Sequence, residues 1–276
     1  MDSAGHAALL RAYFRCGHET SEAWGAVLGV SPTVATAFTA QLLHDPDPEP
    51  SAVAAPPQLY VGMWPHAYYK LLAHVFELWA TSGTNPALQL PPTIDGVIED
   101  RRALDRILAL PVSVVRAIDG TFEAMDAFVH AVGGARGLLT LLGVRCTIGS
   151  QIVCPPTRSQ CMAAFNLKHG GATVRTTLTV GARQWTKHAQ RSLDGWWGTN
   201  KGSEAAKNAL GDAKVTEILD TMVWMNTHGL PNGPIVLEVR QQDGYGARWG
   251  VSGDDVHFRG FVEPYMEDGH ASGWIH

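Results

Sequence analysis

The sequence lacks an apolar run of roughly 18 residues, the length that a helix needs to cross a lipid bilayer. Its longest apolar stretch, 131–144, is interrupted by Arg136 and by four glycines. The first residues, MDSAGH, contain neither the basic nor the apolar segment of a secretory signal. We therefore expect a soluble, cytoplasmic protein without membrane contact, and the nucleus stays open as a second compartment.

Cysteine is scarce, with four residues in a chain of 276. No two of them have the CxxC spacing of structural zinc sites; they are Cys16, Cys146, Cys154 and Cys161. A chain of this length builds a core without disulfides, so we expect free thiols in a reducing compartment. No HExxH-type spacing occurs either. The sequence therefore predicts no metal site, and it leaves any cofactor unknown.

Charge is also sparse, at 17% of the residues, and the net charge is −5. A general polyanion-binding domain would be clearly basic, so nucleic acid is the weaker candidate partner. The charge is unevenly distributed, however. Residues 168–207 contain two acids, Asp194 and Glu204, against seven cations, which are Lys168, Arg175, Arg183, Lys187, Arg191, Lys201 and Lys207. This segment is the strongest electrostatic feature of the sequence.

Apolar residues at helical spacing dominate the first half, residues 1–150. The spacing predicts helices within 4–44 and at 59–81, 98–110, 111–132 and 134–143. Ser31 followed by Pro32 is typical of a helix start. Five prolines in 44–57 predict a linker or an extended surface loop. We expect this half to be a mainly helical region.

The second half, residues 151–276, has the pattern of an α+β module. Thr157 and Ser203 are expected N-caps, and the helix that begins after Ser203 is expected to run to about Asn226. A further helix is predicted at 181–191 and a strand at 174–180. "PIVLEVRQQDGYGARWGV" predicts a hairpin around Asp243-Gly244, and "DVHFRGFVEP" predicts a third strand. The predicted fold is α+β, with a small antiparallel sheet packed by helices.

The basic segment contains the first candidate site. Arg183, Lys187 and Arg191 recur every four residues, which places them on one face of a helix beside His188. This stripe is either a solvated helix face or a cation cluster for a carboxylate or phosphate. Lys201 precedes the next helix, whose N-terminus would favour an anion, although an ordinary N-cap explains the same residues.

Aromatic and histidine residues extend this candidate. Trp196 and Trp197 either stack on a base or sugar or anchor a loop on the core. His228 lies just after the expected long helix, where it complements the helix dipole or acts as a general base.

The expected strands carry further polar residues. In one pairing register, Arg248 lies on the same sheet face as Arg240, His257 and Arg259. A two-residue turn would instead place Arg240 opposite Ala247, and therefore on the other face from Arg248. A shift of the register by one residue would return Arg240 and Arg248 to the same face. The alternative to a binding site is that these residues form a solvated sheet face.

The end of the chain crowds Glu263, Asp268 and His270 into a few residues. Such groups ligate metals or exchange protons, and the alternative is an acidic surface loop. We expect this segment to pack against the basic one.

The combination "LTVGARQWTKHAQRS", "GYGARW" and "FRGFVEPYMEDGH" resembles a family of uncharacterised eukaryotic proteins, plant proteins included. The resemblance covers about 175–276 and implies only that this segment is a shared module. It implies no activity, cofactor or substrate.

Three hypotheses follow. The first is a protein that binds or acts on a small anionic or phosphorylated ligand. Its ligand-binding residues would be Arg183, Lys187, Arg191, Trp196, Trp197, Lys201, Arg248, Glu263 and Asp268. Its proton-transfer residues would be His188, His228 and His270. The alternatives are a protein-interaction or assembly subunit that uses the helical half, and a single-stranded nucleic-acid binder. The sequence does not decide whether the protein is an enzyme.

Overall fold

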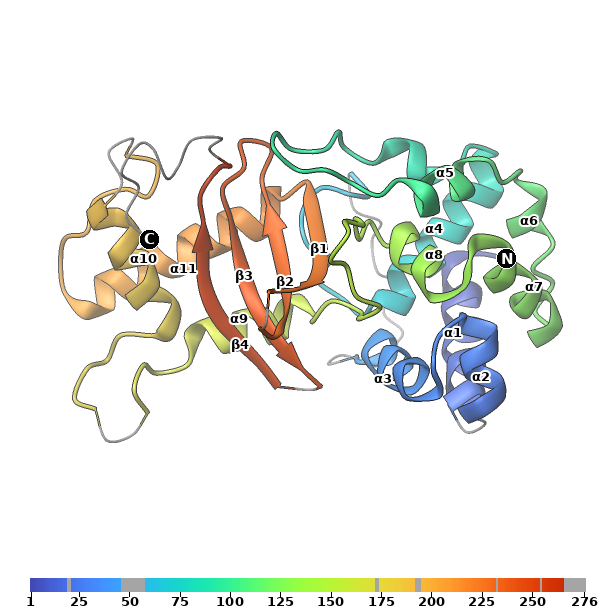
Figure 1. Ribbon diagram of the computed structural model, residues 1–276, viewed down its shortest axis with the longest axis horizontal. Coiled ribbons are helices and arrows are strands. Elements are labelled where there is room, and N and C mark those ends of the chain that lie inside the picture. Colours follow the sequence, from blue (N-terminus) through green and yellow to red (C-terminus); the bar gives the residue numbers. More distant parts are fainter. Residues whose placement is uncertain are drawn as a thin grey trace.

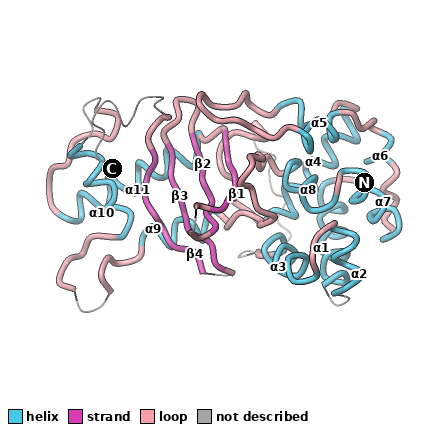
Figure 2. Tube along the Cα trace, viewed as in Figure 1, coloured by secondary structure: helices cyan, strands magenta, loops and turns pink. Residues whose placement is uncertain are grey.

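The computed structural model describes residues 1–18, 21–45, 58–171, 174–191, 195–231, 233–253 and 255–265. Helices fill the first half, and an antiparallel sheet with three further helices follows in the second (Figure 2). The fold is therefore α+β, as the sequence predicts. Within the described part of the chain, no helix is long and apolar enough to cross a membrane.

The first half packs its helices around α4, which runs from Tyr68 to Ser82 and buries Leu72, Phe76 and Trp79 completely. The other helices are α1 (Ser3–His18), α2 (Ser21–Leu28), α3 (Pro32–Leu43), the 3-10 turn η1 (Pro86–Gln89), α5 (Arg102–Leu108), α6 (Ser113–Arg116), α7 (Phe122–Val132) and α8 (Gly134–Leu141). Ser31 caps α3 as expected, because its side chain accepts a hydrogen bond from the Val34 amide.

Two helices of the first half differ from the prediction. The helix expected at 59–81 begins only at Tyr68, because residues 58–67 form turns whose amides bond to the end of a later helix. The helix expected at 111–132 is two helices, since Thr121 caps a new one. Of the proline-rich segment 44–57, residues 46–57 lie outside the described residues.

The second half consists of three helices followed by a four-stranded meander. The helices are α9 (Arg158–Asn166), α10 (Val180–Arg191) and α11 (Glu204–Thr221), and the strands are β1 (Trp224–Gly229), β2 (Ile235–Arg240), β3 (Gly246–Ser252) and β4 (Asp255–Val262). All neighbours pair antiparallel in the order β1-β2-β3-β4. Thr157 caps α9 in a reciprocal capping box with Gln160, and Ser203 caps α11, so both expected caps are confirmed.

Two elements of this half were assigned wrongly from the sequence. The helix expected to reach Asn226 ends at Thr221, and Trp224–Gly229 is a strand. Apolar residues at 215–223 continue the helical spacing, so the period alone hides the change to an extended chain. The strand expected at 174–180 is absent: residues 174–179 are irregular and form a single bridge, Lys168 to Thr179.

The turn between β2 and β3 decides which side chains share a face. The Gln241 amide bonds to the Tyr245 carbonyl, and Gly244 has φ +91°, so the loop has three residues with glycine in the left-handed position. Of the two registers that the sequence left open, the one that places Arg240 and Arg248 on the same face is therefore the one observed. Arg240 lies opposite Gly246, and Glu238 lies opposite Arg248. Because opposite residues share a face, these three charged side chains lie on the same side of the sheet.

The two faces of the sheet differ in character. One face is apolar and packs on the helices: α9 and α10 contact β4, and α11 contacts β2 and β3. The indole of Trp249 donates a hydrogen bond to the Cys161 carbonyl, and Phe165 packs edge-on against Phe258. Figure 1 shows α9 and α11 passing behind the sheet, with α10 beyond β4 and the first-half helices beyond β1. The opposite face is polar.

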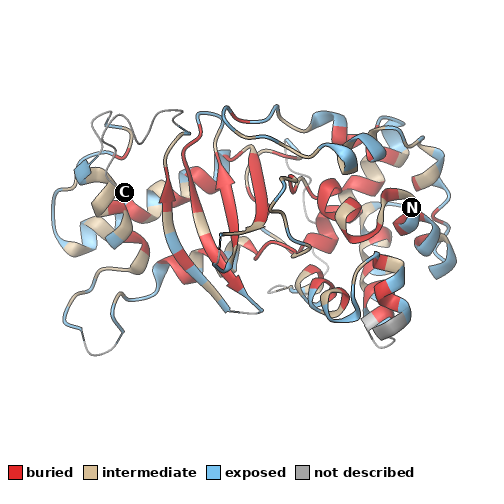
Figure 3. Ribbon diagram, in the orientation of Figure 1, coloured by how far each residue is buried: buried red, intermediate tan, exposed pale blue. Residues whose placement is uncertain are grey.

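Burial follows this layout (Figure 3). Strands β1, β2 and β3 are mostly buried, whereas β4 alternates between buried and exposed residues. Residues 144–151 run beside β1, where Val144 and Ser150 form bridges with Met225 and His228. The edge of β1 is therefore covered by the end of the first half.

Two glycines that are close in space, Gly29 and Gly134, test the packing of the first half. Gly29 has φ +68° and open space around it, whereas Gly134 has φ +67° and its added Cβ would collide with the Leu28 carbonyl oxygen. We expect Gly29→Ala to lower the free energy of unfolding by about 1 kcal/mol, from backbone conformation alone. Gly134→Ala should lower it by about 3 kcal/mol or more, because backbone atoms must also move. Urea unfolding followed by circular dichroism measures both, and equal losses would contradict the packing.

Candidate functional site

The polar face of the sheet is organised around one carboxylate, Glu238, in the middle of β2. Its Oε2 lies 3.0 Å from His228 Nε2 and 2.6 Å from Arg248 Nε. Its Oε1 lies 2.5 Å from Arg240 Nε. The carboxylate thus holds side chains from β1, β2 and β3 in one group, which we call the Glu238 cluster: His228, Glu238, Arg240 and Arg248.

The register explains why these residues meet. Asn226, Glu238 and Arg248 stand opposite one another on three adjacent strands, and His228 and Arg240 lie two residues away on the same face. Side chains two residues apart on a strand point the same way, so all of them project from the polar face.

The Glu238 cluster is buried at its centre and open at its rim. Glu238 is 4% exposed, while the side chain of Arg248 is 34% exposed. Burial raises the pKa of Glu238, but the hydrogen bond from His228 and the charges of Arg240 and Arg248 outweigh burial and hold that pKa well below its usual range. Glu238 is therefore a fixed negative charge that orients three cationic or cation-forming groups.

The three partners of Glu238 differ in which of their nitrogen atoms remain available to a ligand. Among the described residues Arg248 bonds through Nε alone, so its two terminal nitrogens have no partner there and are available to a ligand. The remaining nitrogen of His228, Nδ1, has a long 3.4 Å contact with the Gly229 carbonyl. Arg240 is instead bound through both Nε and Nη1, because Nη1 also donates to the carbonyls of Gly244 and Glu263. The groups open to a ligand are those of His228 and Arg248.

A second histidine stands on the same face. His257 on β4 is exposed and lies opposite Gly250, and a Cβ added at Gly250 would collide with its imidazole. The ring therefore lies across the β3 backbone, toward the Glu238 cluster. The Cα atoms of His228 and His257 are three strand spacings apart, about 14 Å. A β-bulge at Arg248–Trp249 makes Arg259 the additional residue of β4, and it is exposed.

Segments of the first half border the polar face. Asn226, beside Glu238, donates to Thr147 Oγ1 and accepts from Ser150 Oγ. At the other end of β1, the indole of Trp224 donates to Glu99 Oε1 over 3.0 Å, and Arg145 pairs with the same carboxylate at 3.2 Å. Loops 91–100 and 144–151 thus form walls beside the Glu238 cluster.

A separate cluster contains three residues predicted from the sequence. His188 Nδ1 lies 2.7 Å from Glu263 Oε1, and the indole of Trp197 donates to the same oxygen over 2.8 Å. Trp197 is fully buried, and its carbonyl accepts from the Trp185 indole. His188 and Trp197 also pack against Phe261 of β4. This arrangement anchors the loop before α11 onto the helix-covered end of the sheet.

Trp196 belongs to a stack beside that anchor. Its ring lies 4.0 Å from the Tyr245 ring at an interplanar angle of 8°, and Lys214 Nζ lies 4.0 Å from its centroid. Both faces of the indole are therefore covered by side chains of the protein.

The basic residues predicted from the sequence lie elsewhere. Arg183, Arg191 and Lys201 are exposed and Lys187 is half-buried. Arg183 contacts the ring of His169. Within the described part of the chain, no hydrogen bond or ion pair joins these four to Glu238 or Glu263. Asp268 and His270 fall outside the described residues, as does the rest of the tail beyond 265.

The structure thus divides the predicted residues into groups. His228 and Arg248 both bind the carboxylate of Glu238. His188 and Trp197 both bind the carboxylate of Glu263. The basic stripe stands apart from both groups. Sequence reasoning did not select Glu238, although a lone acid in the apolar run "PIVLEVR" was a usable signal. A buried carboxylate in a strand needs cationic partners from adjacent strands.

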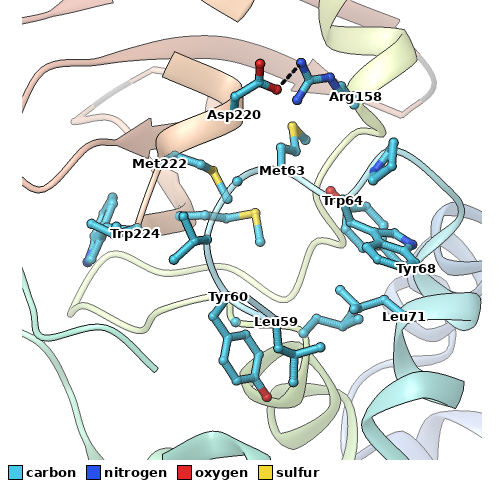
Figure 4. Close-up of a pocket in the computed structure, with 17 residues that line it drawn as sticks. Leu59, Tyr60, Met63, Trp64, Tyr68, Leu71, Arg158, Asp220, Met222 and Trp224 are labelled. Carbon is cyan, nitrogen blue, oxygen red and sulfur yellow. Dashed lines mark ion pairs between the residues drawn. The ribbon is translucent and has the colours of Figure 1, made fainter. Parts of the chain in front are cut away.

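A cavity of about 390 Å³ lies between residues 59–65, the end of α11 and β1 (Figure 4). Its wall is mostly apolar, with Met63, Met222 and Met225 among the lining residues. At one side Arg158 pairs with Asp220 at 2.7 Å. No residue predicted for the site lines this cavity, and its one charged pair is internally satisfied. The residues described show no gathering of three His, Cys, Asp or Glu side chains that could hold a metal ion.

The Glu238 cluster predicts a large loss of stability when its centre is neutralised. Glu238→Gln leaves Arg240, which is 9% exposed, and Arg248 without a counter-charge. We expect the free energy of unfolding to fall by about 3 kcal/mol in urea denaturation. The matched control is Glu217→Gln, which removes an exposed partner of Lys214 and should cost less than about 1 kcal/mol. Similar losses in both variants would contradict the central role of Glu238.

The same carboxylate predicts an acid-sensitive stability. The pKa of Glu238 is depressed in the folded chain, whereas its usual value is 4.5. Its contribution is therefore complete above about pH 4.5 and is lost as the pH falls below that value. Urea midpoints at pH 7 and pH 3.5 should differ more for the native chain than for Glu238→Gln. An equal acid shift in both proteins would show that Glu238 does not contribute.

One of three comparisons with known proteins gave a match. Residues 168–263 match the model of a family described as the CdiA C-terminal tRNase toxin domain. A search of curated proteins gave no match. A search of solved structures also gave none.

The matched span covers about a third of the chain and contains α10, α11 and all four strands, with the whole Glu238 cluster. The match overturns the hypothesis of an uncharacterised protein for a small anionic or phosphorylated ligand, because the family is described by a tRNase activity. The nucleic-acid alternative, which the acidic net charge had made the weaker candidate, agrees better with this finding.

Proposed function

We propose that the protein is an RNA-cleaving enzyme that acts on tRNA at the polar face of its sheet. The observation that carries the proposal is the Glu238 cluster, in which a buried carboxylate orients a histidine and an arginine toward solvent. The span that matches the tRNase toxin model contains this cluster, which supports RNA as the substrate.

RNA offers a reaction that these residues can catalyse without another nucleophile. The 2′-hydroxyl attacks the adjacent phosphorus as it loses its proton to a base. The bond from phosphorus to the 5′-oxygen breaks, and that oxygen takes a proton from an acid. The products are a 2′,3′-cyclic phosphate and a free 5′-hydroxyl. The protein must supply proton transfer and positive charge at the phosphate.

His228 is the residue for proton transfer beside the attacking oxygen. The carboxylate of Glu238 accepts a hydrogen bond from Nε2–H, which leaves Nδ1 as the basic nitrogen of the neutral ring. A carboxylate behind the imidazole also stabilises the cation that forms when the ring takes a proton. Glu238 is thus a positioning residue, and His228 is the catalytic one.

Arg248 supplies the positive charge. Its Nε is held by Glu238 at 2.6 Å, so the guanidinium is oriented before a phosphate arrives. The two terminal nitrogens match the spacing of two phosphate oxygens, a geometry that a lysine lacks. His257, whose ring extends over Gly250 on the same face, is the candidate acid for the departing 5′-oxygen.

The proposal predicts a loss of turnover in His228→Ala. We expect kcat for cleavage of a tRNA transcript to fall by about 10²–10⁴, because proton transfer from a positioned side chain contributes that much. The control is His130→Ala, since His130 is an exposed residue of α7 in the other half. Gel analysis of end-labelled tRNA measures both rates.

The form of the product gives a second check. The cleaved RNA should carry a cyclic phosphate, and a tRNA with a single 2′-deoxy substitution at the cut should resist cleavage there. Undiminished activity in His228→Ala, or cleavage at the deoxy position, would contradict the proposed reaction.

A further inference from the structure

Exposed and half-buried cations on and beside α10 form a group apart from the Glu238 cluster. Arg183, Lys187 and Arg191 follow one face of α10, opposite the buried Ala182 and Trp185. The group continues over neighbouring segments through Lys168, Lys201 and Lys207. We call these six residues the α10 basic surface.

Contacts between neighbouring elements bring Lys168 and the first turns of α11 to the start of α10. The Lys168–Thr179 bridge brings Lys168 to the start of α10. Asn208 of α11 accepts from the Thr179 amide over 3.0 Å, so the first turns of α11 lie beside the same helix end. Lys201 precedes α11 and Lys207 belongs to its first turn. Figure 1 places α10 beyond β4, on the opposite side of the sheet from the first-half helices.

These six cations form no ion pairs with the acids of the described residues, although Arg183 contacts the ring of His169. Glu204, three residues from both Lys201 and Lys207, accepts three hydrogen bonds from Thr176 and Thr177, which lower its pKa to about 2, and the nearby charge of Lys207 also lowers that pKa. Glu204 therefore ties the 174–179 segment to α11.

A stripe of like charges that forms no ion pair with the described acids has a physical cost. Like charges four residues apart on a helix repel one another, and solvated helix faces usually alternate the two signs. The protein as a whole carries a net charge of −5, so the stripe does not reflect a generally basic composition. A polyanion would remove the repulsion by replacing small counterions, and this release favours binding.

We propose that the α10 basic surface docks the sugar–phosphate backbone of the RNA substrate, at a distance from the residues that perform the chemistry. Residues every four positions on a helix rise about 6 Å per step, comparable to the separation of successive phosphates along a strand. The contacts are to phosphates, so they position the RNA without reading its sequence. The inference rests on the proposed function for the identity of the polyanion, but not on the identity of the catalytic residues.

The test is equilibrium binding of a fluorescent tRNA transcript between 50 and 300 mM salt, with His228→Ala as the background that prevents cleavage. The variant Lys187→Gln/Arg191→Gln removes two cations of the surface. The control, Arg15→Gln/Arg101→Gln, removes two exposed cations of the first half and the same net charge. Circular dichroism and urea unfolding establish that both variants are folded.

We expect the α10 variant to bind about tenfold more weakly at 150 mM salt. The slope of log affinity against log salt should also become shallower by about 1.5, because each lost phosphate contact removes roughly 0.7–0.9 from it. The control should keep the native slope. With cleavage restored by His228, the α10 variant should raise KM and leave kcat within about twofold.

Unchanged affinity and slope in the α10 variant would overturn the docking surface, even when the native protein cleaves tRNA. Equal weakening in the control would also overturn it, because net charge alone would then explain binding. If the native protein cleaves no RNA while the α10 variant loses salt-dependent tRNA binding, the proposed enzyme fails and the docking surface stands.

Discussion

One buried negative charge constrains the second half of the molecule. Glu238 stands among apolar strand residues, where an uncompensated carboxylate would be strongly unfavourable. It is tolerated because His228, Arg240 and Arg248 arrive from both neighbouring strands and from its own. Strand order, pairing register and the packing of the apolar face must therefore all be correct for this charge to be stable. The same requirement brings a histidine and an arginine to the surface in fixed orientations, so stability and the proposed chemistry depend on one contact.

The polar face is not built from the matched span alone. Asn226 is held by Thr147 and Ser150, and Trp224 is held by Glu99, so the first half contributes two walls of the site. A Cβ at Gly96 would collide with the Tyr265 ring, which shows how closely loop 91–100 approaches the chain after β4. The helical half therefore shapes access to the sheet and does more than precede it. The cavity beside residues 59–65 lies at the same boundary but is lined by apolar groups.

Much of the fold is readable from the sequence, because caps and periodicity are local signals. Thr157, Ser203 and Ser31 start helices as their side chains dictate, and the α+β class follows from helical spacing giving way to alternation. The first strand is not readable in this way, since apolar residues before Trp224 continue a helical period. Its residues are extended because they pair with β2 and with residues 144–151, and such pairing is a tertiary effect.

The candidate site shows the same limit. Charge density pointed to α10, whereas the most tightly connected ionisable group surrounds Glu238, whose partners come from three strands. Their convergence depends on a register that composition cannot supply. Trp197 and Glu263 are both selected from the sequence, but their contact is not predicted. They lie 66 positions apart and meet through a hydrogen bond that no spacing rule anticipates. The net charge ranked nucleic acid below a small anion, whereas the match of 168–263 to the tRNase toxin model favours nucleic acid.

The hairpin loop after β2 has a further consequence for how this protein can evolve. Its three residues set the parity of the pairing, so that Glu238 and Arg248 face the same way. If one codon of this loop were lost and the loop kept its three-residue form, the pairing of β2 with β3 would shift by one residue and place Glu238 opposite Ala247. Arg248 would then lie on the opposite side of the sheet from Glu238, whereas His228 and Arg240 would keep their places. Length in this exposed turn is consequently under stricter constraint than residue identity, the reverse of what is usual for surface loops.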